Sequence, residues 1–281
     1  MDRPVTGDVQ SVARTNEHYI LSTGEAGAAR LAILGRALQP TTAAFLARAG
    51  LGSGMRTLDA GCGGGDVTRL IASMIDDAEV VGVDIDPDVI EIAARDAQDG
   101  HVRPPRFLVS PADDLPEIGD FDVVYSRFLL THVTDPVLVL RSLASRCRPG
   151  GTIAVEDVDF AAHVCDPPSW AFARFVELYQ LAALANGADP CIGPKLPGLL
   201  DSVGLVDVES TALVPTFTDG EGKLVAYLTF EQIRPTLGAS GLIDESEMRA
   251  ISQELQRLGG DGTSMMSLAG IVQASGRAPA R

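Results

Sequence analysis

Several residue types that mark particular protein classes are scarce in this chain. Among its 281 residues only Lys195 and Lys223 are lysines, four residues are histidines and four are cysteines. The cysteines, Cys62, Cys147, Cys165 and Cys191, form no Cys-x-x-Cys pair, so reduced thiols are the default. The histidines are scattered along the chain, and no protein-ligated metal is therefore expected.

Long apolar runs and a positive net charge are also missing. No run approaches the ~18 apolar residues of a membrane helix, and the N-terminus has no signal-peptide core, so we expect a cytoplasmic protein without a membrane partner. The balance of 22 basic and 38 acidic residues gives a net charge of −16, which repels phosphate backbones and argues against nucleic acid as a partner. Hydrophobic residues make up 46% of the chain and charged residues 21%, an ordinary globular composition that excludes wholesale disorder.

Short apolar runs alternate with helical patterns between residues 55 and 158. We predict strands at 55–60, 79–83, 106–109, 121–125 and 152–158. Apolar residues at helical spacing follow the first strand, and the Asp-Pro pairs at 86–87 and 135–136 supply the N-cap and first residue of two later helices. This alternation predicts an α/β fold, a doubly wound parallel sheet covered on both faces.

The two ends of the chain differ from this core. Residues 1–50 show no strand pattern and are predicted to form a helical cap, with helices at 26–38 and 41–49. The cofactor-binding core is assigned to residues 51–160. Residues 161–281 are predicted to supply lid helices, one at 166–186 and two within 222–258, and strands at 205–214 and 265–275 that complete the sheet as an antiparallel hairpin.

A glycine-rich loop follows the first predicted strand. The sequence from Leu58 to Asp66 reads LDAGCGGGD, and glycines there permit a tight turn and let a ligand approach the backbone. Asp84 closes the second strand 23 residues after Gly61, near the ~20 at which an acid meets ribose hydroxyls. Asp66 stands where a dinucleotide-binding loop has its third glycine, and no Tyr-x-x-x-Lys pair is present, which disfavours a nicotinamide-dependent reductase. A cationic or zwitterionic nucleoside suits this loop better.

Four ordered motifs carry a family resemblance. The segments LDAGCGGG, VVGVDID, FDVVYSRFLLTHV and RPGGTIAVED resemble the class I S-adenosylmethionine-dependent methyltransferases, within them the small-molecule group of ubiquinone-biosynthesis-type and natural-product enzymes. The resemblance covers roughly residues 15–160. It implies a Rossmann-like seven-stranded sheet whose last strand is antiparallel, and S-adenosyl-L-methionine as the cofactor.

The resemblance also implies roles for individual residues. Asp84 would hold the ribose hydroxyls and Ile85 would pack on the adenine, whose edge would meet Ala112 and Asp113. The methionine part of the cofactor would lie against Asp59, Ala60, Gly61, Cys62 and Gly63, with Ser126 and Arg127 bordering it and the substrate cavity. Tyr19 resembles an N-terminal aromatic residue that closes over the cofactor, and a half-buried core tyrosine explains it equally well.

The candidate catalytic residues follow the fourth and fifth strands. His132 is the best candidate for a base, which the reaction needs only if the acceptor must lose a proton; a structural histidine before Pro136 is the alternative. Glu156 and Asp157 end the fifth strand, and strand alternation would turn only one of them toward the cavity. His18 and His163 are weaker candidates.

Two further features of the sequence are ambiguous. Residues 166–169 (DPPS) resemble a motif that reads planar nitrogens, but they follow the fifth strand instead of ending the fourth, so a helix start explains them. Phe172, Phe175 and Tyr179 share one face of the inserted helix beginning near Trp170, where they serve either as core or as a lid over an apolar acceptor.

The sequence therefore predicts an enzyme that moves a methyl group to an oxygen or nitrogen of a small organic acceptor. A protein that keeps the cofactor fold but binds without methylating stays open, because fold does not fix chemistry. A homodimer, formed by exchange of the N-terminal cap, stays open as well.

Overall fold

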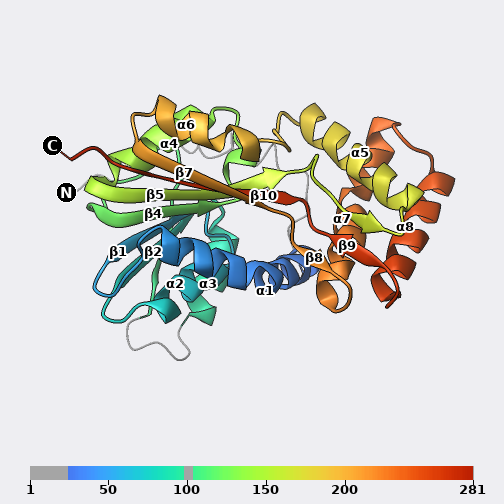
Figure 1. Cartoon of the computed structure of the whole chain (residues 1–281), viewed down its shortest axis with the longest axis horizontal. Helices are drawn as coiled ribbons and strands as arrows, with labels where there is room; N and C mark the ends of the chain where they lie inside the picture. The colour runs from blue at the N-terminus through green and yellow to red at the C-terminus, as the bar shows by residue number, and fades with distance from the viewer. Residues whose placement is uncertain (1–24, 98–103, 281) are drawn as a thin grey trace, which may run out of the picture.

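A seven-stranded sheet forms the larger part of the molecule (Figure 1). The computed structural model describes residues 25–97 and 104–280. The strand order is β3-β2-β1-β4-β5-β10-β7, in which the first five strands pair in parallel and β10 runs antiparallel to both β5 and β7. The strands are β1 (Arg56–Ala60), β2 (Glu79–Asp84), β3 (Arg106–Val109), β4 (Phe121–Arg127), β5 (Cys147–Asp159), β7 (Val206–Leu213) and β10 (Gly270–Arg277). The predicted Rossmann-like sheet with its last strand antiparallel is confirmed.

Helices cover both faces of this sheet (Figure 1). One face is covered by α1 (Glu25–Arg48), α2 (Asp66–Met74) and α3 (Pro87–Asp96), the other by α4 (Pro136–Ser145) and α6 (Leu196–Ser202). Because side chains alternate along a strand, Val124 packs in the α4 and α6 layer while Tyr125, its neighbour in β4, packs against α1 and α2. Both faces are therefore buried, as a parallel sheet requires.

A second core lies beyond the end of β5, at the right in Figure 1. It is built from α5 (Trp170–Ala185), α7 (Val225–Ser240) and α8 (Glu245–Gly260). A small sheet of β6 (Cys165–Asp166), β9 (Met265–Ser267) and β8 (Thr216–Phe217) joins it. Helix α1 connects the two cores, because Leu38 packs near Val225 of α7 while Leu46 packs in the core of the sheet.

Three local predictions were wrong. The cap helices at 26–38 and 41–49 are one helix, α1, which continues through Pro40 because buried side chains on both sides of the proline hold it. The strand expected at 265–275 is divided into β9 and β10, and β9 pairs with β6 and β8 in the small sheet. Strand β4 extends to Arg127, so Ser126 and Arg127 lie within the strand rather than after it.

Within residues 25–97 and 104–280, no helix combines the length and apolar character that a membrane span needs. In the same ranges, no three His, Cys, Asp or Glu side chains gather as a set of metal ligands.

Candidate functional site

The glycine loop turns the chain sharply between β1 and α2. The backbone N–H groups of Gly61 and Cys62 both donate to the carbonyl of Val83, at 2.9 and 3.0 Å, which ties the loop to the end of β2. Gly65 has φ of +79°, and a Cβ there would lie 2.9 Å from the ring of Phe107. Only glycine satisfies both the conformation and the space at this position.

Two carboxyl groups flank this loop. Asp59 is buried and accepts a hydrogen bond from the hydroxyl of Thr68 in α2 at 2.6 Å, and burial raises its pKa to about 6. Asp84 accepts one backbone hydrogen bond on each oxygen, from Gly63 at 2.8 Å and from Asp86 at 3.1 Å. Each oxygen of a carboxylate accepts about two bonds, so each Asp84 oxygen keeps one position for a ligand donor.

A cavity of about 860 Å³ opens beside this loop. Nine of the twelve sequence-predicted cofactor residues line it: Asp59, Gly61, Cys62, Gly63, Asp84, Ile85, Ala112, Asp113 and Arg127. Ala60 and Ser126 are buried beside it without lining it, and Tyr19 lies outside the described residues. The structure thus brings residues from the ends of β1, β2, β3 and β4 together around one space.

The same cavity extends to the second core. Phe160, Phe175 and Tyr179 line its far part, and the rings of Phe160 and Tyr179 stack at 3.8 Å between centroids. Phe172 is buried without lining the cavity, and the Trp170 side chain is exposed. Helix α5 therefore contributes to the core, and Phe175 is at the same time part of the cavity wall; its role as a lid over an acceptor stays a prediction.

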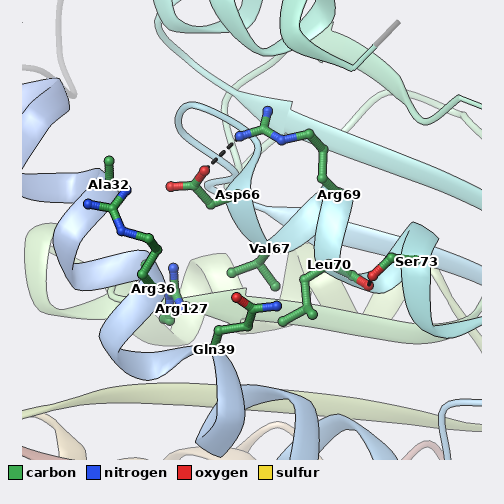
Figure 2. Close-up of a pocket in the computed structure, with 10 residues that line it drawn as sticks. Ala32, Arg36, Gln39, Asp66, Val67, Arg69, Leu70, Ser73 and Arg127 are labelled. Carbon is green, nitrogen blue, oxygen red and sulfur yellow. Dashed lines mark hydrogen bonds and ion pairs between the residues drawn. The ribbon is translucent and has the colours of Figure 1, made fainter. Parts of the chain in front are cut away.

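A smaller pocket of about 340 Å³ lies between α1 and α2 (Figure 2). Two of the arginines that line it, Arg36 and Arg69, form ion pairs. Arg69 forms an ion pair with Asp66 at 2.6 Å, drawn as the dashed line in Figure 2, and Arg36 pairs with Glu221 at 2.6 Å.

His132 lines the cavity from the short helical turn η3 (Leu130–His132) that follows β4. Burial, and secondly the charge of Arg30, lower the pKa of His132 to about 4. The imidazole is therefore neutral at pH 7, and its proton affinity suits hydrogen bonding better than abstraction of a strongly held proton.

Glu156 and Asp157 are buried, and neither is among the described residues that line the cavity. Glu156 accepts hydrogen bonds from Thr42, Tyr125 and Gln273. Asp157 points elsewhere and accepts from the backbone of Thr131 at 3.1 Å, and burial raises its pKa to about 7. The two residues do alternate, but the expectation that one of them faces the cavity is not met.

His163 also lines the cavity, although from the sequence it ranks below His132. Its Nδ1 lies 3.0 Å from the carbonyl oxygen of Phe160, which only accepts, so Nδ1 carries the proton and Nε2 has a free electron pair. Burial lowers its pKa to about 4. The nearby DPPS segment lies partly in β6, which pairs with β9 and not with the sheet around β4.

Comparisons with known proteins agree with this geometry. The family model described as "Methyltransferase domain" matches residues 51–187. A ubiquinone biosynthesis O-methyltransferase of Xanthomonas campestris is 28% identical over 54% of this chain and 70% of that enzyme. A trans-aconitate 2-methyltransferase of Methylobacterium radiotolerans is 32% identical over 60% of this chain and 62% of that enzyme. The solved phosphoethanolamine N-methyltransferase 2 of Haemonchus contortus has 16% identity and a TM-score of 0.53, covering 85% of this chain and 52% of its own, which is a likeness of fold alone.

Proposed function

We propose that the chain is a class I S-adenosylmethionine-dependent methyltransferase that methylates an oxygen or nitrogen of a small, largely apolar acceptor, as its similarity to the methyltransferase-domain model and to two small-molecule methyltransferases supports. One observation carries the proposal. A single cavity runs from the glycine loop and Asp84 to the aromatic side chains of Phe160, Phe175 and Tyr179, with room for a nucleoside at one end and an acceptor at the other. The cytoplasm as its location and a homodimer as its assembly remain predictions.

The residues at the loop end fit the cofactor. The free acceptor positions on Asp84 suit a pair of ribose hydroxyls, and Ile85 offers an apolar surface beside it for the adenine. Ala112 and Asp113 come from the turn after β3 and would meet the adenine edge. Asp59, Gly61, Cys62 and Gly63 with Arg127 would border the methionine part, backed by Ala60 and Ser126, and Tyr19 would close over it. S-adenosylmethionine supplies an electrophilic methyl group on sulfur.

The enzyme's own share of the reaction is orientation and exclusion of water, which in favourable systems is worth up to ~7–11 kcal/mol. His132 lines the cavity as a neutral imidazole and would accept a hydrogen bond from the acceptor. Asp157 holds the backbone of Thr131, the residue before His132, and so would position that turn. Glu156 would act indirectly, because its hydrogen bonds link β5 to Tyr125 of β4 and to Gln273 of β10.

The proposal is tested in two steps. Calorimetric titration with S-adenosylhomocysteine should give a dissociation constant in the micromolar range. Incubation with S-adenosylmethionine and a panel of phenols, carboxylic acids and amines should then release S-adenosylhomocysteine. Tight cofactor binding with no methyl transfer to any acceptor would favour the alternative, a protein that binds without methylating.

Phe175 provides a test of the acceptor end. Phe175→Leu should weaken acceptor affinity severalfold and leave S-adenosylhomocysteine binding unchanged, because the side chain lines the cavity far from the glycine loop. The same change should lower stability by about 1 kcal/mol, since it nearly conserves apolar volume. Phe172→Leu is the matched control: it lies in the same core without lining the cavity and should leave acceptor affinity intact. Equal effects of the two variants on acceptor affinity would contradict the assignment.

A further inference from the structure

Among the residues that the structure describes, Arg30 is a buried cation of the cavity that pairs with no acidic side chain. Arg30 of α1 lines the cavity and is 6% exposed, and its Nε is buried without a hydrogen-bond partner. Among the residues that the structure describes, Arg30 forms no hydrogen bond and no ion pair. Burying a guanidinium group without a partner lowers the stability of the folded protein. A bound anion that pairs with the group would offset this free-energy cost.

The other cations nearby do have partners. Arg69, which also lines the cavity, pairs with Asp66 and donates to the carbonyl of Gly64. Arg127 donates to the hydroxyl of Thr42, and its charge acts on Asp59 at the glycine loop. Arg36, about a turn and a half beyond Arg30 on α1, pairs with Glu221 and points into the smaller pocket (Figure 2). Arg30 therefore differs from these arginines in its burial and in having no partner within the described part of the chain.

The surroundings of Arg30 indicate which chemical group would pair with its guanidinium group. Its charge acts on His132, which follows β4, whereas Arg127 acts on Asp59 at the loop where the methionine part of the cofactor would lie. A chain with a net charge of −16 repels anions as a whole, so an anionic ligand needs a local cation to enter. The planar fork of a guanidinium group matches a carboxylate in two parallel hydrogen bonds.

We propose that the acceptor is an organic acid. Its apolar part would be about the size of an aromatic ring, and Arg30 would bind its carboxylate within the cavity. This inference rests on the proposed methyl transfer and narrows its substrate class. The apolar part would lie against the side chains of Phe160, Phe175 and Tyr179. The carboxylate that Arg30 binds is not the group that is methylated. The oxygen or nitrogen that accepts the methyl group lies elsewhere on the same molecule.

The test uses the full chain saturated with S-adenosylhomocysteine. Salicylate, 4-hydroxybenzoate and caffeate are each titrated calorimetrically beside their own primary amides, which keep the shape and lose the charge. At least one acid should bind the natural protein tenfold or more tightly than its amide, and Arg30→Met should abolish that preference while leaving S-adenosylhomocysteine affinity unchanged. Arg36→Met, a matched change on the same helix, should keep the preference. The melting temperature of ligand-free Arg30→Met should equal or exceed that of the natural protein, because an unpaired buried charge is removed.

The outcomes separate the two proposals. If no acid binds, if acids and amides bind alike, or if Arg30→Met keeps the preference, the carboxylate assignment is overturned. If Arg30→Met instead loses S-adenosylhomocysteine binding, Arg30 serves the carboxylate of the cofactor and the assignment is again overturned. The proposed function fails separately, when the natural protein releases no S-adenosylhomocysteine with any acceptor.

Discussion

Asp84→Ala is expected to raise the dissociation constant for S-adenosylhomocysteine by about a hundredfold. The reason is twofold. The carboxyl group has one acceptor position free on each oxygen for the ribose hydroxyls, and each charge-assisted hydrogen bond is worth about 1.5–3 kcal/mol. The same group holds the backbone N–H of Gly63, so its removal also frees the glycine loop. Isothermal titration at pH 7.5 measures the change directly.

Two further variants make this result specific. Asp84→Asn keeps the side-chain shape but turns an amide N–H toward one of two backbone donors, so it should bind more weakly than the natural protein and more tightly than Asp84→Ala. Glu91→Ala removes an exposed acid from α3 nearby and should leave the affinity within about twofold. A dissociation constant for Asp84→Ala close to that of the natural protein would refute the ribose assignment.

The loop end of the site was predictable because its signals are local. Asp86 and Asp135 were predicted as N-caps from their Asp-Pro pairs, and each accepts a backbone hydrogen bond in the first turn of its helix, from Asp88 and Leu138. The glycine spacing and the distance to Asp84 are likewise properties of one short β-α-β segment. Parallel strands then bring their carboxyl ends to one edge of the sheet whatever the loops contain.

The acceptor end could not be predicted in the same way. Arg30 lies in a helix with little apolar periodicity, and its burial depends on how α1 crosses the cavity, a tertiary property. The division of the last predicted strand falls at residues 268 and 269, directly before Gly270, and a single glycine within an apolar run does not by itself predict a break. The division follows from pairing with β6 and β8, segments two residues long that carry no pattern of their own.

Glu156 illustrates how strand alternation can mislead. The pattern indicates correctly that Glu156 and Asp157 face opposite sides of β5. It does not reveal that helix α1 and strand β10 fill the side that Glu156 faces. The partners of Glu156 come from residues 42, 125 and 273, positions that only the folded chain brings together.

Glu156→Ala is therefore expected to act on stability first, lowering the free energy of unfolding by about 3–5 kcal/mol. The change leaves two buried hydroxyls, those of Thr42 and Tyr125, without their acceptor, and it removes one of the two acceptors of the Gln273 side-chain amide, which still donates to the carbonyl of Thr41. Urea unfolding, followed by circular dichroism, measures the loss. Glu209→Ala, an exposed acid of β7, should stay within about 0.5 kcal/mol of the natural protein.

Separating this structural role from a catalytic one requires a variant that folds. Glu156→Gln keeps an acceptor oxygen for the two hydroxyls and should lose only about 1–2 kcal/mol, because its amide can no longer accept from Gln273. A double-mutant cycle with Tyr125→Phe should give a coupling energy of about 1–3 kcal/mol, as for partners in one buried network. Methyl transfer by Glu156→Gln should stay within a few fold of the natural rate. A fully stable Glu156→Gln that has lost methyl transfer would instead place Glu156 in the chemistry.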